Sequence, residues 1–535
     1  MHAKLDQERL TVFKGTFIDL AAEPDVAATS TAPPVHNLRI REGVISVKNG
    51  RITDTDWSVK TEEDLCAFLK SKYGYEEKAN AAAAAPLADA SNEITVDTAS
   101  DIRVVRSSEE QNGFFFPGFV DTHIHAPQYQ NVGIFGKTTL LDWLTTYTFP
   151  LESSFREKKD GDHCTKYDTV PPQLAYDRVV QKTLSHGTTC ASYFGTIHVQ
   201  ATHMLARTCR ERGQRALIGR VCMDRKDTCA DFYRDESTED ALAATKESVK
   251  AILDEPSFSG LIEPIVTPRF APSCTEEALK GLADVAASYE PPLRIQTHIS
   301  ENLKEIEWVK ELFPGSKSYA DVYDRYGLLT PRMILAHGIH LSPEERSLIQ
   351  QRGSGISHCP PSNSAIGSGL CPVRTLLDSG IPVGLGTDVS GGWHPSMLEV
   401  VRQTCLVSRL LEFSQEYIKD QRECGKNDIE HGRQKIGVPE ALYLATRGGA
   451  KVVDMHGDDG IGGFDVGRQF DAQLIELGVP LTQRQRHEVE QYDRTSSNVD
   501  IFGWETWEEK IDKWVWNGDD RNVKSVWVAG AEVKR

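Results

Sequence analysis

The sequence predicts an α/β fold: a (β/α)8 barrel, or TIM barrel, with a small β-sandwich-like domain built from both termini. Eight short apolar runs follow one another along the chain, most of them separated by helical stretches, and strands that are apolar throughout are typical of a buried parallel sheet. Strand-like segments also precede and follow this region. Because 535 residues exceed what one core usually holds, a second lobe is expected.

The first part of the chain, residues 1–113, is assigned to the small β domain. In "LRIREGVISVKNGRITDT" apolar residues alternate on both sides of Asn49-Gly50, and this pair favours a two-residue hairpin turn because both residues tolerate a positive φ. An insertion over about 58–111 contains "EEDLCAFLKSKYG", which predicts a helix. It also contains the alanine-rich "NAAAAAPLADASNE", which has little apolar area to bury and is interpreted as a surface insertion.

Residues 114–461 are assigned to the barrel. The candidate strands are "FFFPGFVDTHIH", "GTTCASYFG", "RALIGRVCMD", "LIEPIVTPRF", "PLRIQTHIS", "RMILAHGIH", "GISHCP" and "IPVGLGTDVS". Candidate helices such as "EEALKGLADVAASY" and "SPEERSLIQQRG" lie between them. Eight such units indicate a (β/α)8 barrel, a fold of roughly 250 residues before insertions.

The last part, residues 462–535, returns to short strands and is assigned to the small β domain. The segments are "FDAQLIEL" and "VKSVWVAGAEVK", and the second is interpreted as a hairpin around Ala529-Gly530. We expect these segments to pair with the N-terminal strands in a small sheet outside the barrel.

Charge and composition argue against several classes of partner. The formal net charge is -18 and no dense run of Lys and Arg occurs, so neither nucleic acid nor an anionic membrane is expected as a partner. The N-terminus lacks the apolar segment of a signal peptide, and no apolar stretch approaches the roughly 20 residues that cross a bilayer. The 11 cysteines include no C-x-x-C pair and fit reduced thiols in the cytoplasm.

Two histidines end the first candidate strand of the barrel. His123 and His125 point to the same face because side chains alternate along a strand, and this is the spacing that a single metal needs. Taken alone, the pair is equally consistent with two buried structural histidines. His298, His337 and Asp388 end three other candidate strands, at the rim where barrel active sites assemble. The set as a whole therefore favours a shared metal site.

Three imidazoles and one carboxylate suit a borderline-soft cation such as zinc, with room for a water whose pKa would fall toward roughly 7. Glu301 lies three residues after His298, close enough to serve as a proton shuttle. The same spacing would also fit a first-turn glutamate that the helix dipole favours. Both interpretations stay open at this point.

Several motifs together resemble the amidohydrolase superfamily of metal-dependent hydrolases, and specifically its guanine deaminases. They are "PGFVDTHIHAPQYQ", "LLDWLTTYTFP", "HGTTCASYFGTIH", "VCMD", "VTPRF", "THISEN", "LAHG", "SHCPPSN" and "GLGTDVSGG". The resemblance runs from about Phe114 to Gly392, with weaker matches in "ATRGGA" and near the C-terminus. Many amidohydrolases share H-x-H and the late aspartate, whereas "QYQ", "FGTIH" and "VTPRF" at these places are far less common.

The resemblance implies a homodimeric enzyme with one zinc ion per chain and a catalytic set at the rim of the barrel. The implied metal ligands are His123, His125, His298 and Asp388. Glu301 corresponds to the family's proton-transferring glutamate, and His337 to the histidine that orients the metal-bound water. Asp388 is also implied as a catalytic residue, because it can accept the proton of that water.

The resemblance also implies a substrate, guanine, and a reaction, its hydrolytic deamination to xanthine and ammonia. The implied substrate contacts are Gln128, Arg269, Phe270, His298 and Asp388. Arg269 cannot lose its proton and suits the O6 and N7 acceptors, and Gln128 can donate and accept. Apart from the resemblance, a less favoured alternative is that Arg269 pairs with an acidic residue at a structural strand end, and Gln128 could equally be an ordinary rim residue.

Two alternatives for the function remain. The nearer one is the same chemistry on another aminated ring, such as 8-oxoguanine, a pterin or an aminotriazine, and the set Gln128, Arg269 and Phe270 favours guanine over these. The other is a non-enzymatic scaffold of the same fold. A scaffold predicts eroded metal ligands, and none is eroded here.

Overall fold

The computed structural model describes residues 9–21, 36–75, 93–94, 102–135, 139–157, 165–414, 419, 432–483 and 497–534. Almost all of the alanine-rich stretch lies outside these residues. The chain divides into two compact units, one formed mainly by Phe119–Met455 and one by segments that precede Phe119 and follow Met455. No helix among the described residues is both long and apolar enough to cross a lipid bilayer.

Parallel strands form the barrel in the order β7-β8-β9-β11-β12-β13-β14-β15, and β10 (Val221–Cys222) pairs beside β11. The bounds are β7 Phe119–His125, β8 Thr188–Phe194, β9 Arg215–Gly219, β11 Ile262–Pro268, β12 Arg294–Ile299, β13 Met333–His337, β14 Gly355–His358 and β15 Val383–Leu385. Each neighbouring pair in this order is hydrogen-bonded in parallel. The predicted barrel is therefore confirmed.

Two backbone hydrogen bonds join the segment after β15 to β7. The amide of His125 donates to the carbonyl oxygen of Val389 at 3.0 Å, and the amide of Asp388 donates to that of His123 at 2.8 Å. These bonds connect the first and last strands of the sheet at their C-terminal ends. The ring closes at the point where three of the predicted site residues lie.

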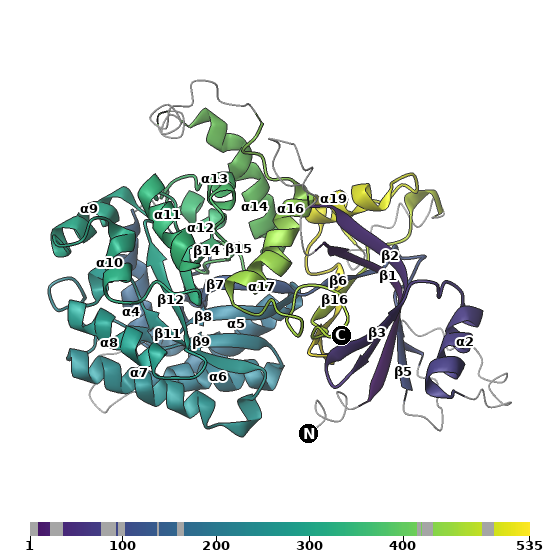
Figure 1. Ribbon diagram of the computed structural model, residues 1–535, viewed down its shortest axis with the longest axis horizontal. Coiled ribbons are helices and arrows are strands. Elements are labelled where there is room, and N and C mark those ends of the chain that lie inside the picture. Colours follow the sequence, from purple (N-terminus) through teal and green to yellow (C-terminus); the bar gives the residue numbers. More distant parts are fainter. Residues whose placement is uncertain are drawn as a thin grey trace. The chain divides into compact units, whose positions relative to one another are not determined.

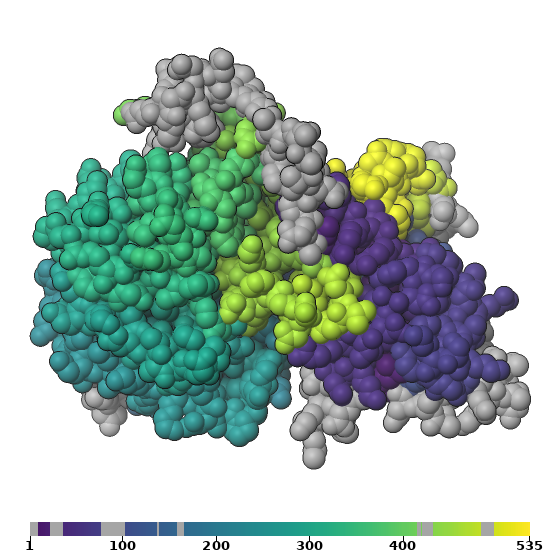
Figure 2. Space-filling model, in the orientation of Figure 1, coloured from purple at the N-terminus to yellow at the C-terminus, as the bar shows by residue number. Residues whose placement is uncertain are grey.

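Helices surround the strands of the barrel unit (Figure 1). They include α5 Pro172–Ser185, α6 Val199–Arg212, α7 Thr238–Leu253, α8 Glu276–Ala287, α9 Leu303–Leu312, α10 Tyr319–Arg325, α11 Pro343–Arg352, α12 Pro360–Ala365, α13 Val373–Asp378, α14 Met397–Leu410 and α16 Val438–Tyr443. In the space-filling view the teal and green parts of the chain form the visible surface of this unit (Figure 2). The strands beneath them are almost entirely buried.

Local sequence explains where the predicted helices begin and end. In "SPEERSLIQQRG" the Ser342 side chain accepts from the amide of Glu345, whose carboxylate accepts from the amide of Ser342, and Gly353 ends α11 with φ 73°. This is a capping box at the start of the helix and a left-handed glycine at its end. The helix predicted from "EEALKGLADVAASY" is α8, which Thr275 caps.

The second unit is built on one sheet with strands from both ends of the chain, in the order β18-β17-β16-β6-β1-β2-β3, with β5 also on β1 and β4 on β5. The bounds are β1 Leu10–Leu20, β2 Leu38–Lys48, β3 Arg51–Asp56, β4 Glu93–Ile94, β5 Ile102–Arg106, β6 Phe114–Pro117, β16 Ala472–Ile475, β17 Val523–Val528 and β18 Ala531–Lys534. Both predicted hairpins, β2-β3 and β17-β18, are confirmed. The predicted helix is α2, Glu62–Tyr73.

This sheet curls so strongly that it encloses its own apolar core. β1 and β17 are three strands apart in the order, which in a flat sheet would separate them by about 14 Å. The rings of Phe13 and Trp527 nevertheless lie 5.2 Å apart, centroid to centroid. Phe115 of β6 joins the same cluster. The run "FFFP" at the start of the first candidate barrel strand therefore forms β6 of this sheet, and the barrel strand β7 begins at Phe119.

Two adjacent glycines let the segment "ATRGGA" pack directly against the barrel strands. This segment forms the π-helical turn η8 (Leu444–Gly448) and the start of α17 (Gly449–Val452). A Cβ on Gly448 would lie 2.8 Å from the carbonyl oxygen of Val383, and one on Gly449 would lie 2.9 Å from Cβ of Val120. Both glycines are needed because the helix backbone touches β15 and β7.

We expect Gly448→Ala to lower the midpoint of thermal unfolding. Its helical φ of -61° suits alanine, but the new methyl group would press on strand backbone, and overpacking costs about 1–3 kcal/mol. Gly457→Ala is the control, because there the nearest atom is Asp459 Oδ1 at 3.5 Å. Equal midpoints for the two variants in a calorimetric scan would contradict the packing account.

Candidate active site

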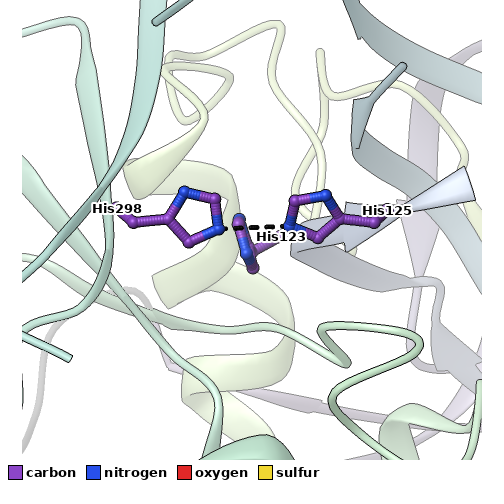
Figure 3. A group of neighbouring side chains, drawn as sticks. All are labelled: His123, His125 and His298. Atoms are coloured by element: carbon purple, nitrogen blue, oxygen red, sulfur yellow. Dashed lines mark hydrogen bonds between the residues drawn. The ribbon is translucent and has the colours of Figure 1, made fainter. Parts of the chain in front are cut away.

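The histidines and the aspartate predicted from strand ends come together at the C-terminal rim of the barrel. His123 and His125 end β7, and His298 lies near the end of β12. His125 Nε2 lies 3.1 Å from His298 Nε2, and the ring of His123 packs beside both rings, with centroid distances of 4.9 and 4.8 Å (Figure 3). Asp388 Oδ1 lies 3.2 Å from His123 Nε2 and 3.6 Å from His125 Nε2.

His337 forms a second group with two of these residues. Ligand atoms of His123, His337 and Asp388 lie within 4.8 Å of one another, as do those of His123, His125 and His298. His337 Nε2 is 3.8 Å from Asp388 Oδ2. All five side chains thus face one small volume at the end of β7, β12, β13 and β15.

Backbone contacts decide which nitrogen of His298 carries a proton. Its Nδ1 lies 2.6 Å from the carbonyl oxygen of Arg269, which can only accept, so Nδ1–H is the donor. Burial, together with the neighbouring His123 and His337, holds the pKa of His298 well below its usual value, so the ring is neutral. Nε2 therefore presents a lone pair to the centre, as a metal ligand must.

The ends of β13 and β15 have a strained backbone at the site residues. His337 has φ 73° and Asp388 has φ 46°, in the left-handed region that non-glycine residues rarely adopt. Such conformations cost of order 1–3 kcal/mol each and persist where the surroundings enforce them. A glycine of "GLGTDVSGG" lets this segment pack closely against β7. A Cβ on Gly386 would lie only 2.9 Å from Cβ of His123, which is too close for any other residue.

Asp121 was not predicted as a site residue, but its hydrogen bonds hold the backbone beside two candidate metal ligands, His123 and Asp388. Its carboxylate accepts from the amide and hydroxyl of Thr387, at 3.0 and 2.6 Å, and from the amide of His123 at 3.2 Å. Burial raises the pKa of Asp121 to about 7. This one side chain ties β7 to the residue that precedes Asp388.

Glu301 lies beside the centre without being part of the His-Asp groups. Its Oε2 is 3.5 Å from His337 Nε2, and its Oε1 accepts from the hydroxyl of Ser368 at 3.0 Å. Burial raises the pKa of Glu301 to about 7. Because α9 begins at Leu303 with Asn302 as its cap, Glu301 precedes the helix, and the alternative of a first-turn glutamate is wrong.

The end of the site away from the histidines is polar and contains a buried ion pair. Arg269 Nη1 donates to Glu152 Oε2 at 2.6 Å, and Gln128 Nε2 donates to Glu152 Oε1 at 2.8 Å. The acidic partner that the sequence analysis considered for Arg269 thus exists. Arg269 and Gln128 nevertheless both line the same pocket as the histidines.

One pocket joins the histidine centre to this polar end. It encloses about 420 Å³, its open mouth included, and its lining residues are His125, Gln128, Leu140, Trp143, Leu144, Arg269, Phe270, His298, Glu301, Glu305, His337, Ile366 and Asp388. Every predicted site residue except His123 is part of the lining. Apolar side chains from "LLDWL" and Phe270 form walls that suit a flat ring.

Comparison with known proteins places the chain in a family. The family model described as "Amidohydrolase family" matches residues 114–533. A probable guanine deaminase of Schizosaccharomyces pombe is 47% identical over 419 residues, which are 78% of this chain and 71% of that protein. The guanine deaminase of Dictyostelium discoideum is 43% identical over 423 residues, 79% of this chain and 83% of that protein.

The chain belongs to the guanine deaminases of the amidohydrolase family. The resemblance found in its motifs is therefore confirmed. Among solved structures, a guanine deaminase from C. acetobutylicum with bound guanine in the active site has a TM-score of 0.71 and 30% identity to this chain. The match covers 98% of this chain and 99% of that one.

The residues of this guanine deaminase family member suit a metal ion. His123 Nε2 and His337 Nε2 are buried ring nitrogens that have no hydrogen-bond partner in the described part of the chain. Buried polar atoms are rarely left without a partner; a cation beside Asp388 would supply one for His123, and a water on that cation would supply one for His337. Imidazole nitrogens and a carboxylate are also the donors that structural and catalytic metal sites use.

We expect Asp121→Ala to lower the midpoint of thermal unfolding and to weaken metal retention. The substitution would leave the buried amide and hydroxyl of Thr387 without an acceptor, at about 1–3 kcal/mol for each. Asp142→Ala is the control, because Asp142 is exposed and its carboxylate accepts only the hydroxyl of Thr139 among the contacts described. If both variants unfold and hold metal like the parent, Asp121 does not brace the site.

Proposed function

We propose that this protein is a guanine deaminase that hydrolyses guanine to xanthine and ammonia with one zinc ion per chain. One observation carries the proposal. A single pocket extends from a group of histidines and Asp388, which suits a metal ion, to Arg269 and Gln128. Guanine offers both of the features that such a pocket needs: an amino group on the amidine-like carbon C2, and the acceptors O6 and N7 along another edge. The similarity to guanine deaminases over most of the chain supports the same substrate.

His123, His125, His298 and Asp388 would hold the zinc ion. The neutral tautomer of His298 and the carboxylate of Asp388 are both in the state that a ligand requires: burial opposes the charge of Asp388, but its histidine neighbours outweigh burial and hold its pKa far below the usual range. When bound, zinc lowers the pKa of a water molecule toward roughly 7, so that a strong nucleophile exists at neutral pH.

Glu301 and Asp388 would move the protons of the reaction. As the water oxygen bonds to C2, Asp388 accepts a proton from the water, and Glu301, whose pKa is about 7, delivers one to N3. Asp388 then returns its proton to the amino nitrogen, the bond between C2 and that nitrogen breaks and ammonia leaves, while the hydroxyl on C2 gives its proton to Glu301 and becomes the carbonyl of xanthine. His337 would orient the water between these two carboxylates, because its Nε2 lies 3.5 Å from Glu301 Oε2 and 3.8 Å from Asp388 Oδ2.

Gln128, Arg269 and Phe270 would place the base. Arg269 has N–H groups beyond those that bind Glu152, and these suit the O6 and N7 acceptors. Phe270 and the apolar side chains Leu140 and Leu144 line the walls beside the ring plane. The base would then lie with C2 toward the histidines and O6 toward Arg269.

We also infer a cytoplasmic homodimer. The nine described cysteines are all free, which fits a reducing compartment. The homodimer rests on the family resemblance.

We expect the purified protein to convert guanine to xanthine and Glu301→Gln to be nearly inactive while it keeps its metal. The amide cannot carry the proton to N3, whereas the proposed zinc ligands are untouched. Loss of one general acid or base costs about 100- to 10,000-fold in rate. Ultraviolet absorbance follows the reaction, and elemental analysis measures zinc.

Glu307→Gln is the matched control, because Glu307 is an exposed glutamate in α9 and should leave activity unchanged. A panel of 8-oxoguanine, pterins and aminotriazines tests the substrate. Turnover of one of these with guanine untouched would refute guanine as the substrate, and an active Glu301→Gln would refute the proton shuttle.

A further inference from the structure

A buried glutamate outside the lining of the pocket joins the two polar residues that face the base. Glu152 is the penultimate residue of α4 (Phe149–Ser153), and its side chain is 0% exposed. Its carboxylate receives Arg269 Nη1 at 2.6 Å, Arg269 Nη2 at 3.2 Å and Gln128 Nε2 at 2.8 Å. The pair with Arg269 is bidentate, a geometry that fixes orientation as well as charge.

The fold holds Glu152 firmly in this place. The π-helical turn η3 (Leu144–Thr148) leads into α4, and the carbonyl of Tyr147 in that turn accepts from Asn131 Nδ2 at 3.1 Å. The ring of Phe149 lies under the guanidinium of Arg269, 5.2 Å from centroid to Cζ. The motif "LLDWLTTYTFP" therefore contributes apolar walls to the pocket and Phe149 beneath Arg269, and Glu152 follows two residues after the motif ends.

Glu152 neutralises the charge of Arg269 without any bound base. Its guanidinium is buried, and the carboxylate of Glu152 outweighs that burial and keeps the pKa of Arg269 above its usual value. A carboxylate and a guanidinium in contact leave no net charge at this end of the pocket. The site thus suits a neutral ring, while Arg269 stays a permanent donor.

Glu152 also fixes which way the amide of Gln128 points. A carboxylate only accepts, so the atom of Gln128 that faces it must be the nitrogen. Gln128 Oε1 then faces Ser390, whose backbone amide donates to it at 3.3 Å. The reversed amide would place oxygen against carboxylate and nitrogen against an amide N–H, so only one orientation satisfies both neighbours.

The hydrogen-bonding groups left over at this end are mainly donors. Gln128 keeps one N–H, and Arg269 keeps those N–H groups that do not bind Glu152. A ring edge with acceptors can satisfy them. A ring edge with an exocyclic amino group would place donor against donor, and buried donors without a partner reject a ligand strongly.

We propose that Glu152 is a positioning and specificity-determining residue, which holds Arg269 and Gln128 as donors so that the pocket selects an aminated ring whose far edge carries acceptors. This deepens the proposed function and rests on it. Glu152 acts through its two partners and does not itself touch the base.

A pair of matched substrates tests this role. Guanine and 2,6-diaminopurine carry the same amino group at C2 and the same N7, but position 6 bears an oxygen acceptor in the first and an amino donor in the second. We expect the parent protein to prefer guanine in kcat/KM by at least about 100-fold. In Glu152→Gln, kcat/KM for guanine should fall by about 100-fold, mainly through KM, and that for 2,6-diaminopurine by less than about 10-fold.

Zinc content and the thermal midpoint of each variant separate positioning from folding, and Glu307→Gln serves as the exposed control. If Glu152→Gln folds, holds zinc and keeps the full preference for guanine, Glu152 is only structural and the proposal is overturned. If the parent turns over neither purine, the proposed function fails and this inference fails with it.

A swap variant covers the case in which Glu152→Gln does not fold. Glu152→Gln combined with Gln128→Glu keeps one carboxylate and one amide beside Arg269 but reverses their places. We expect this variant to fold and to have lost the preference for guanine, because the carboxylate now lines the pocket and accepts. A swap variant with the parent's preference would overturn the proposal.

Discussion

The closure of the barrel between β7 and the segment after β15 is the constraint on which the whole site depends. Two backbone hydrogen bonds, His125 to Val389 and Asp388 to His123, bring the first and last strands together. Each of these bonds involves a site residue, so the contacts that close the ring also position the site. Asp121 stabilises the same contact between β7 and the segment after β15, because it accepts a hydrogen bond from the amide of Thr387. The backbone of Asp388 adopts a left-handed φ in this turn, which is unfavourable for a residue other than glycine.

Two buried carboxylates of the site have pKa values that are shifted in opposite directions. Desolvation, reinforced by the carboxylates of Asp388 and Glu305, outweighs His337 and raises the pKa of Glu301 to about 7, so it can carry a proton at neutral pH. Asp388 is also buried, but its interactions with the neighbouring histidines outweigh desolvation and hold its pKa far below the usual range. Two acidic groups with separated pKa values are what an acid–base mechanism requires. Both residues lie at the rim of the barrel, and their different neighbours there separate the two pKa values.

The sequence predicted those parts of the molecule that local patterns determine. The barrel follows from apolar runs alternating with helices, both hairpins follow from their turn residues, and His123, His125, His298, His337 and Asp388 were found because each ends a candidate strand. The structure brings these five together. The roles given to them remain predictions.

Residues defined by contacts between distant segments could not be found in this way. Glu152 meets Arg269 across 117 positions in the chain, and Asp121 meets Thr387 across 266, and neither pair has a spacing that a local pattern would reveal. Strand β5 and the assignment of "FFFP" to the terminal sheet were missed for the same reason, because pairing with β1 and β16 decides them. The sequence does not reveal that Glu152 is the partner of Arg269, so it left open whether Arg269 contacts the substrate or pairs with an acidic residue.

The central claim is that one zinc ion lies at the C-terminal rim of the barrel, held by side chains from three different strand ends. Anomalous diffraction at the zinc absorption edge, from crystals of the protein as purified, tests it most directly. The account predicts a single peak per chain, about 2.0–2.2 Å from nitrogen atoms of His123, His125 and His298 and an oxygen of Asp388. A map without a peak there, or with zinc bound only by other residues, would contradict the account.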